Sequence, residues 1–263
     1  CTLADGPAGV GEAEDMMNAP WYGATKMEFR LRFFSAWLIY MAAFACYSFD
    51  KIPAGAAVGH WLRNWFGGPT EDLWVRAVFL AAAAFTFLGA AVRTWGTSYL
   101  TSAVVFAQQL HSDKLIADGP FRYVRNPLYF GNLPIAFGLG LTASRTGFLV
   151  LFFGMLVCVL RLIVREEAEL RETQGESYRA YCAAVPRLIP SLRPRVPPGD
   201  AKPNWVDGFL REFFWWGAAT AVLLLALTMN GVIFQRVFLG SFVVWVVMLL
   251  ARRNKQQTPE NGS

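Results

Sequence analysis

The sequence predicts an all-α protein, a polytopic membrane helical bundle of about six transmembrane helices. Of its 263 residues, 55% are hydrophobic and only 16% are charged, whereas about 25% of residues are charged in a typical soluble domain. In addition, several apolar runs approach the roughly 20 residues that a helix needs to cross a bilayer. The alternative is a large soluble protein with buried helices.

Six apolar runs define the expected spans. They occupy residues 33–49, 73–92, 127–142, 146–164, 213–229 and 232–250. The fourth run continues without a break into a charged helix, which Pro186 should end. The stretch 98–107 is too short to cross a bilayer, and we expect an interfacial segment or a half-helix there.

Basic residues give the bundle an orientation. Most of the 24 Lys and Arg residues fall in segments 1–32, 93–126, 161–212 and 251–263, and the positive-inside rule places such segments in the cytoplasm. We therefore expect an integral protein of a bacterial cytoplasmic membrane with both termini cytosolic. The net charge of +5 then reflects membrane orientation, and no nucleic-acid partner is expected.

The same patterns divide the chain into four parts. They are an N-terminal cytosolic segment (1–32), a membrane core (33–192), a linker (193–212) and a C-terminal hairpin with a basic tail (213–263). The proline-rich composition of residues 186–203 supports the linker. The four cysteines and two histidines are scattered without a CxxC pair, which argues against a metal site.

Three segments carry residues suited to binding or catalysis. The first, residues 119–131, reads GPFRYVRNPLYFG. Its turn residues predict a structured loop, and Pro127 suits the first turn of the next helix. Free backbone N–H groups at a helix start attract anions, and Arg122 and Arg125 add cationic donors. The alternative is an interfacial anchor of aromatic and Arg side chains.

The second segment, residues 161–172, reads RLIVREEAELRE. Glu166 and Glu167 are neighbours on a helix and cannot face the same way. A salt-bridged surface explains most of these charges. A carboxylate that faces inward so near a membrane span nevertheless needs a partner, and a cationic or hydroxyl-rich ligand would serve.

The third segment, residues 175–190, reads GESYRAYCAAVPRLIP. Tyr178, Tyr181 and Val185 recur on one helical face, which predicts a helix docked on the core. GxGxxG, P-loop, GxSxG and HExxH signatures are absent from the chain.

Together and in this order, the three segments resemble the isoprenylcysteine carboxyl methyltransferase and phospholipid methyltransferase superfamily of membrane enzymes. The resemblance covers about residues 115–190. It implies a membrane methyltransferase core, S-adenosylmethionine as cofactor and a lipid or lipophilic small molecule as acceptor. The implied cofactor-binding residues are Leu115, Gly119, Pro120, Tyr123, Arg125, Asn126, Pro127, Tyr129, Gly131, Glu166 and Glu167.

Residue chemistry suggests how these positions would act. Tyr123 or Tyr129 can stack on adenine, and Arg125 can hold the cofactor carboxylate. Glu166 or Glu167 can take the ammonium or the ribose hydroxyls. The catalytic candidates are Arg161, which could orient an acceptor carboxylate, and Glu167.

Two departures from the family pattern matter. Asn126 replaces a frequent histidine, so a proton-shuttle role there is not expected. Asp113 also replaces a histidine, which weakens the case for a prenylcysteine acceptor. The hairpin 213–250 lies outside the pattern and could bind a protein partner. An NADPH-dependent sterol-reductase-like enzyme and a non-catalytic membrane subunit remain the alternatives.

Overall fold

The computed structural model describes residues 23–68, 70, 72–110 and 117–257. These residues form α-helices and short 3₁₀ turns, and no named strand occurs among them. The elements are α2 (Lys26–Arg30), α3 (Arg32–Ala45), η1 (Cys46–Ser48), α4 (Ala54–Phe66), α5 (Leu73–Leu110), η2 (Gly119–Arg122), α6 (Pro127–Thr142), α7 (Arg145–Ala184), α8 (Trp205–Thr228) and α9 (Gly231–Gln257).

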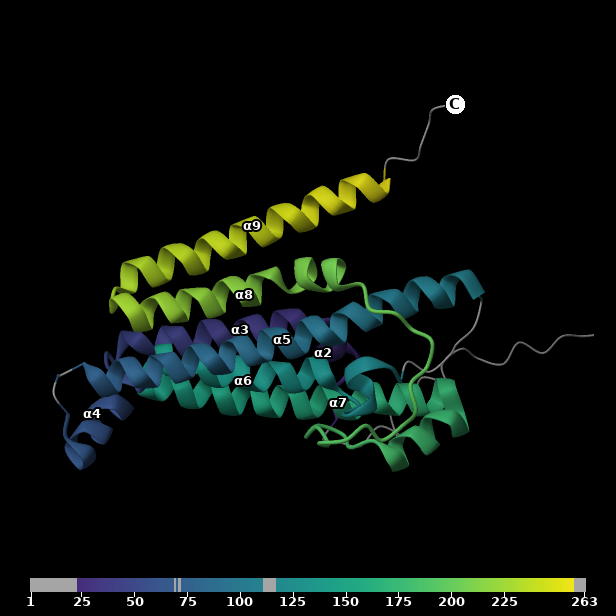
Figure 1. Cartoon of the computed structure of the whole chain (residues 1–263), viewed down its shortest axis with the longest axis horizontal. Coiled ribbons are helices and arrows are strands. Elements are labelled where there is room, and N and C mark those ends of the chain that lie inside the picture. The colour runs from purple at the N-terminus through teal and green to yellow at the C-terminus, as the bar shows by residue number, and fades with distance from the viewer. Residues whose placement is uncertain (1–22, 69, 71, 111–116, 258–263) are drawn as a thin grey trace, which may run out of the picture.

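The longer helices run side by side along the long axis of the molecule (Figure 1). Helix α5 packs on α4, α6 and α8, while α7 packs on α3 and α6. Helix α9 packs on α8 and forms the outer layer at the top of Figure 1. The loop before α6, the charged half of α7 and the segment that follows it meet at one end. We call residues 117–126 and 161–200 the motif end.

Within the part of the chain that the structure describes, four helices are long and apolar enough to cross a membrane. They are Leu73–Leu100, Arg145–Ala184, Trp205–Thr228 and Gly231–Arg252. The two other expected spans form shorter helices, because α3 tightens into η1 after 14 residues and α6 has 16. The fold is therefore the expected all-α membrane bundle, with four full-length candidate spans and two shorter helices beside them.

Helix α5 corrects the expectation for residues 98–107. These residues are not a separate half-helix, because α5 continues through them as one 38-residue helix. Ser98 is buried, and its carbonyl oxygen accepts a hydrogen bond from the backbone N–H of Asn204 at 3.0 Å. Thr97 and Ser98 are thus buried within the protein, and they do not end the helix.

Helix α7 extends well beyond a bilayer. At 1.5 Å per residue its 40 residues would span about 60 Å, twice the hydrocarbon thickness of about 30 Å. Its apolar part lies before Arg161, and the charged part beyond it belongs to the motif end. Gly175 breaks the helical geometry with φ 57° and ψ −129°, so the last turns run in a new direction.

Small residues let the central helices approach closely. A Cβ on Gly89 of α5 would lie 2.5 Å from the carbonyl oxygen of Gly131 on α6. About two turns further along α6, a Cβ on Gly138 would collide with the carbonyl of Ala82 and the hydroxyl of Thr86. Close backbone contact of this kind is typical of helices packed in membranes.

The start of α8 corrects the view of residues 193–212 as linker throughout. Residues up to Asn204 have no regular structure, but α8 begins at Trp205. Asn204 accepts a hydrogen bond from the Asp207 N–H and so caps the helix. Helix α8 then lies along α5.

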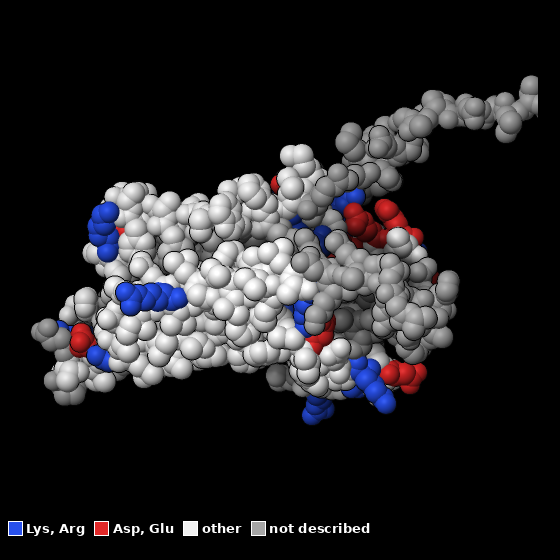
Figure 2. Space-filling model, turned by 90° about the horizontal axis from the view of Figure 1, so that it is seen from above, with Lys and Arg blue, Asp and Glu red and all other residues white. Residues whose placement is uncertain are grey.

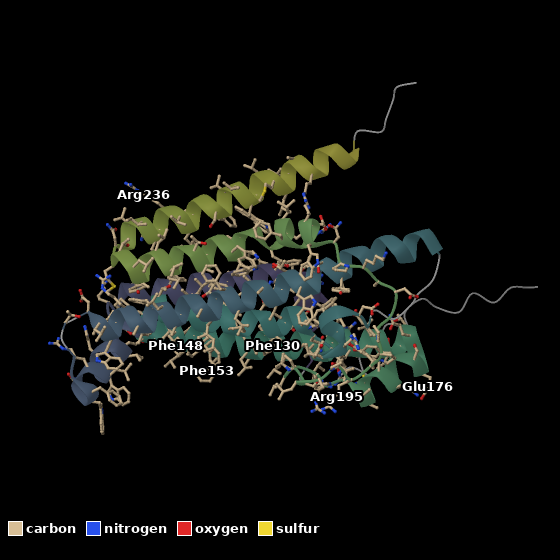
Figure 3. All side chains as sticks on the ribbon, viewed as in Figure 1. Phe130, Phe148, Phe153, Glu176, Arg195 and Arg236 are labelled. Carbon is tan, nitrogen blue, oxygen red and sulfur yellow. The ribbon has the colours of Figure 1, made fainter. Side chains whose placement is uncertain are left out.

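Charged side chains concentrate near the ends of the molecule, and the middle of the face seen in Figure 2 is almost free of them. In Figure 3, Glu176 and Arg195 lie at the motif end and Arg236 lies at the opposite end, with Phe148 and Phe153 between them. An apolar belt between charged ends is what a bilayer-spanning protein requires.

Candidate active site

The loop before α6 has a fixed shape. Gly119 adopts a left-handed φ of 55°, and a Cβ there would collide with the ring of Tyr99. Only glycine combines that backbone conformation with so close a contact. Pro120 and Phe121 are buried in η2, and Pro127 is the first residue of α6, as predicted.

The segment after α7 holds this loop in place. Tyr178, Tyr181 and Val185 form a buried cluster, which matches the expectation that this face docks on the core. Backbone and hydroxyl groups then join the two segments: Tyr181 Oη to Phe121 O at 2.7 Å, Arg125 N to Pro186 O at 2.9 Å, Ser191 N to Tyr123 O at 2.9 Å and Arg195 N to Arg122 O at 2.8 Å.

Glu167 joins all three motif segments at one buried carboxylate, which is 1% exposed. Asn126 Nδ2 donates to Oε1 at 3.1 Å, and Arg187 Nε donates to Oε2 at 3.1 Å. Arg125 Nη1 and Arg171 Nη2 approach the same Oε2 at 3.4 Å. Three guanidinium groups thus surround one carboxylate, which leaves the cluster with excess positive charge.

Glu166 faces a different surface of α7. Burial raises the pKa of its carboxyl group, while a hydrogen bond with the Tyr129 hydroxyl and the charge of Arg32 act in the opposite direction. The two glutamates therefore have separate partners, as their adjacent positions on a helix predicted. Glu166 and Tyr129 meet where the first turn of α6 approaches α7.

Arg161 lies apart from the Glu167 cluster. Its Nη2 donates to Glu28 Oε2 at 2.8 Å, and its carbonyl accepts from Ala24 N at 3.1 Å. The backbone N–H of Thr25 and the Arg161 guanidinium hold the pKa of Glu28 below its ordinary value. Arg161 thus binds the segment before α3, and its role towards an acceptor remains a prediction.

The structure brings Arg125, Asn126 and Glu167 together and leaves other predicted residues elsewhere. Gly131 lies in the contact between α5 and α6. Leu115 lies outside the described residues. Tyr123 lies beside Trp95, with ring centroids 5.8 Å apart.

Sequence reasoning missed Arg187 as a site residue. It follows Pro186 in the third segment, but nothing in the local pattern relates it to a carboxylate 20 positions earlier. Arg171 was visible only as an i+4 neighbour of Glu167, a spacing that is common on exposed helices.

Two features suit an anionic ligand group. The Arg125 side chain is 9% exposed, and its buried Nε has no hydrogen-bond partner among the described residues. A buried unpaired donor is costly, and a ligand carboxylate would satisfy it. In addition, Asn126 makes no side-chain cap at the start of α6, and its amide nitrogen instead donates to Glu167 and to the Arg187 carbonyl. The residues present therefore fit the carboxylate of an amino-acid cofactor.

A membrane helical bundle with a polar, arginine-rich site at one end is the class that fold and geometry define. Residues 77–177 match the phospholipid methyltransferase family, and this match confirms the resemblance to the isoprenylcysteine carboxyl methyltransferase and phospholipid methyltransferase superfamily. No curated protein and no solved structure matches the chain significantly. The matched range begins in α5 and ends two residues after Gly175, so α3, α8 and α9 lie outside it.

Proposed function

We propose that the protein transfers a methyl group from S-adenosylmethionine to a lipid or another membrane-soluble acceptor at the cytosolic face. The observation that carries the proposal is the convergence of three motif segments on Glu167. The family match supports methyl transfer as the reaction class. A carboxylate, amine or thiol would be a suitable acceptor.

Residues of the motif end would share the binding. Arg125 offers its unpaired Nε to the cofactor carboxylate, and the start of α6 offers backbone N–H groups. Tyr123 would stack on the adenine, and Glu166 would face the ammonium or the ribose hydroxyls. Glu167 would act as a positioning residue, because its oxygens already accept hydrogen bonds from protein groups.

S-adenosylmethionine supplies an electrophilic methyl group when bound. The chain's task is then to hold cofactor and acceptor in line, and such positioning can contribute several kcal/mol of barrier lowering. No side chain needs to move a proton when the acceptor is already an anion. Asn126, which cannot titrate near neutral pH, is compatible with this mechanism.

The NADPH-dependent alternative also has an observation in its favour. The Arg171 and Arg187 side chains are each 44% exposed beside Glu167, and exposed guanidinium groups suit a phosphate as well as a carboxylate. A non-catalytic subunit would bind neither cofactor.

Calorimetry on detergent-purified protein separates these functions. We expect S-adenosylmethionine to bind and NADPH not to bind, and Arg125→Ala and Glu167→Gln to weaken S-adenosylmethionine binding. Arg179→Ala is the matched control, because Arg179 forms an exposed ion pair with Glu176 at the same end. Binding of NADPH alone would overturn the proposal, and binding of neither would favour the non-catalytic subunit. Incubation of a lipid extract with methyl-labelled cofactor would then identify the acceptor.

A further inference from the structure

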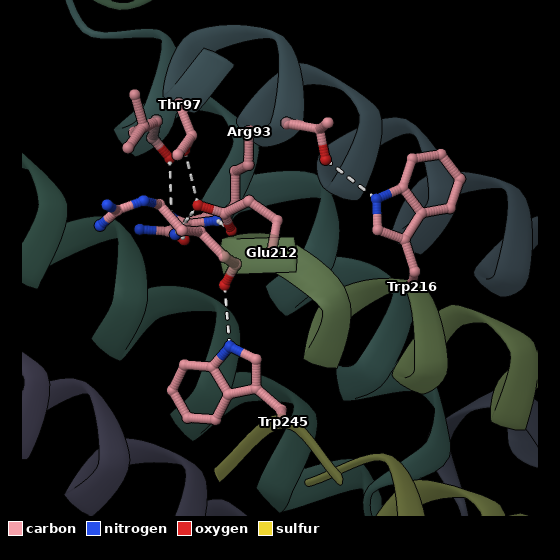
Figure 4. Close-up of polar contacts among 9 residues, drawn as sticks. Arg93, Thr97, Glu212, Trp216 and Trp245 are labelled. Atoms are coloured by element: carbon pink, nitrogen blue, oxygen red, sulfur yellow. Dashed lines mark hydrogen bonds and ion pairs between the residues drawn. The ribbon is translucent and has the colours of Figure 1, made fainter. Parts of the chain in front are cut away.

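A second buried ion pair joins α5 to α8, away from the Glu167 cluster (Figure 4). Arg93 Nε donates to Glu212 Oε2 at 2.7 Å and Nη2 donates to Oε1 at 3.1 Å, a two-pronged contact. The Thr97 hydroxyl donates to the same Oε1 at 2.7 Å. The Arg93 and Glu212 side chains are 14% and 6% exposed, so this is a buried and well-satisfied charge pair.

The third donor group of Arg93 binds α6. Its Nη1 donates to Asn132 Oδ1 at 2.7 Å and approaches the Leu128 carbonyl at 3.4 Å. Both acceptors belong to the first turns of α6, which begins directly after the motif loop. A single guanidinium thus fixes the start of α6 against α5 and α8.

The start of α6 is where the candidate site residues attach. Asn126 precedes the helix and donates to Glu167, and Tyr129 lies in its first turn against Glu166. A displacement of this turn would move both contacts. Small displacements of positioning groups change binding and rate strongly, by as much as about a hundredfold for 1 Å.

Arg93 needs Glu212 to hold this arrangement. A buried guanidinium whose carboxylate is removed is left uncompensated, and it will seek water or another anion. The family match covers residues 77–177, so it includes Arg93 and Asn132 but not Glu212. The C-terminal hairpin therefore supplies the charge that balances an arginine inside the matched part.

We propose that Glu212 is a positioning residue for the cofactor site, which acts through Arg93 on the first turn of α6. The hairpin of α8 and α9 then contributes, through Glu212, to the geometry of the cofactor site. This inference rests on the proposed function for its effect on binding, but its effect on α6 can be measured without any ligand.

The matched control is Thr94→Val. Thr94 is the next residue on α5, and its hydroxyl accepts a hydrogen bond from Trp216 Nε1 of α8 at 2.9 Å. Its loss weakens the same interface between α5 and α8. No hydrogen bond of Thr94 among the described residues reaches α6.

The experiment compares Glu212→Gln with Thr94→Val in detergent. Hydrogen exchange of peptides covering residues 127–133 should accelerate in Glu212→Gln and stay unchanged in Thr94→Val. The Kd for S-adenosylmethionine should rise about tenfold in Glu212→Gln and stay within about twofold in the control. Glu212→Asp should restore part of the affinity.

Equal changes in the two variants would overturn the inference, because a general loss of packing between α5 and α8 would then explain both. If the wild-type protein binds no S-adenosylmethionine, the proposed function fails, and the exchange comparison alone decides the inference. Should Glu212→Gln not fold, Asn132→Ala replaces it. That variant removes the shorter of the two Arg93 contacts with α6 and leaves the ion pair intact, and it should accelerate the same peptides.

Discussion

Glu167 shows how one side chain can hold together segments that lie far apart in the sequence. Its carboxylate contacts groups from the loop before α6, from its own helix and from the segment after α7. Removing the charge would leave Arg125 buried without its counter-ion. Such uncompensated charges are among the most destabilising changes known in proteins.

We therefore expect Glu167→Gln to lower the free energy of unfolding by about 3 kcal/mol. Glu169→Gln is the matched control on the same helix, because Glu169 is 43% exposed and pairs with Arg165; it should cost at most about 1 kcal/mol. Thermal unfolding in detergent measures both. Equal melting temperatures for the two variants would show that the Glu167 cluster contributes little to stability.

Asp50 offers a test of pH dependence at the end opposite the motif end. It accepts hydrogen bonds from the backbone N–H and the hydroxyl of Thr146 and from the Arg145 guanidinium. The Thr146 N–H is the largest cause, and together these groups lower the pKa of Asp50 to about 2. A group whose pKa is depressed by folding stabilises the protein above its unfolded pKa of about 3.9.

This contribution should be complete at neutral pH and should disappear as the pH falls from about 4 to about 2. Asp50→Asn should therefore melt below the wild-type protein at pH 7, and the difference should shrink over that interval. Melting curves of both proteins from pH 7 to pH 2.5 check this. A difference that is independent of pH would contradict it.

At the scale of helices, the apolar runs predicted most of the elements, because the length of an apolar run and the thickness of a bilayer are directly related. They do not reveal that residues 98–107, too short to cross a bilayer alone, continue the helix that begins at Leu73. Ser98 and Thr97 face α8, and hydropathy alone cannot distinguish a polar residue that faces a partner helix from one that faces water. The site was likewise predictable only in part. Arg125 and Asn126 lie in a recognisable motif, whereas Arg187 and Glu212 reach their partners only through the tertiary fold.

Glycine packing can be tested at the same scale. Gly138→Ala should destabilise the protein by about 1–3 kcal/mol, because the added methyl group must displace the backbone of α5. Gly240→Ala is the control, since nothing lies within 4 Å of a Cβ there on α9. It should leave the melting temperature unchanged or raise it slightly, as alanine favours helix over glycine. A larger loss in Gly240→Ala than in Gly138→Ala would contradict the close contact between α5 and α6.

For the whole molecule, the two ends of the long axis carry different sets of charged and aromatic side chains. The motif end carries the arginine cluster and the half of α7 that extends beyond the apolar belt. The opposite end carries α4, where Trp61 and Trp65 are exposed beside Arg63. Tryptophan is enriched at membrane interfaces, whereas an excess of Lys and Arg marks the cytoplasmic side.

We therefore expect the motif end to be cytosolic and α4 to face the other side. Single cysteines at Arg195 and His60, both exposed, can be introduced after the native cysteines are replaced by alanine. A membrane-impermeant maleimide added to intact spheroplasts should label His60→Cys and spare Arg195→Cys. Inverted vesicles should give the opposite pattern. Because a methyl donor made in the cytosol can reach only a cytosolic site, labelling of Arg195→Cys from outside would contradict both the orientation and the placement of the cofactor site.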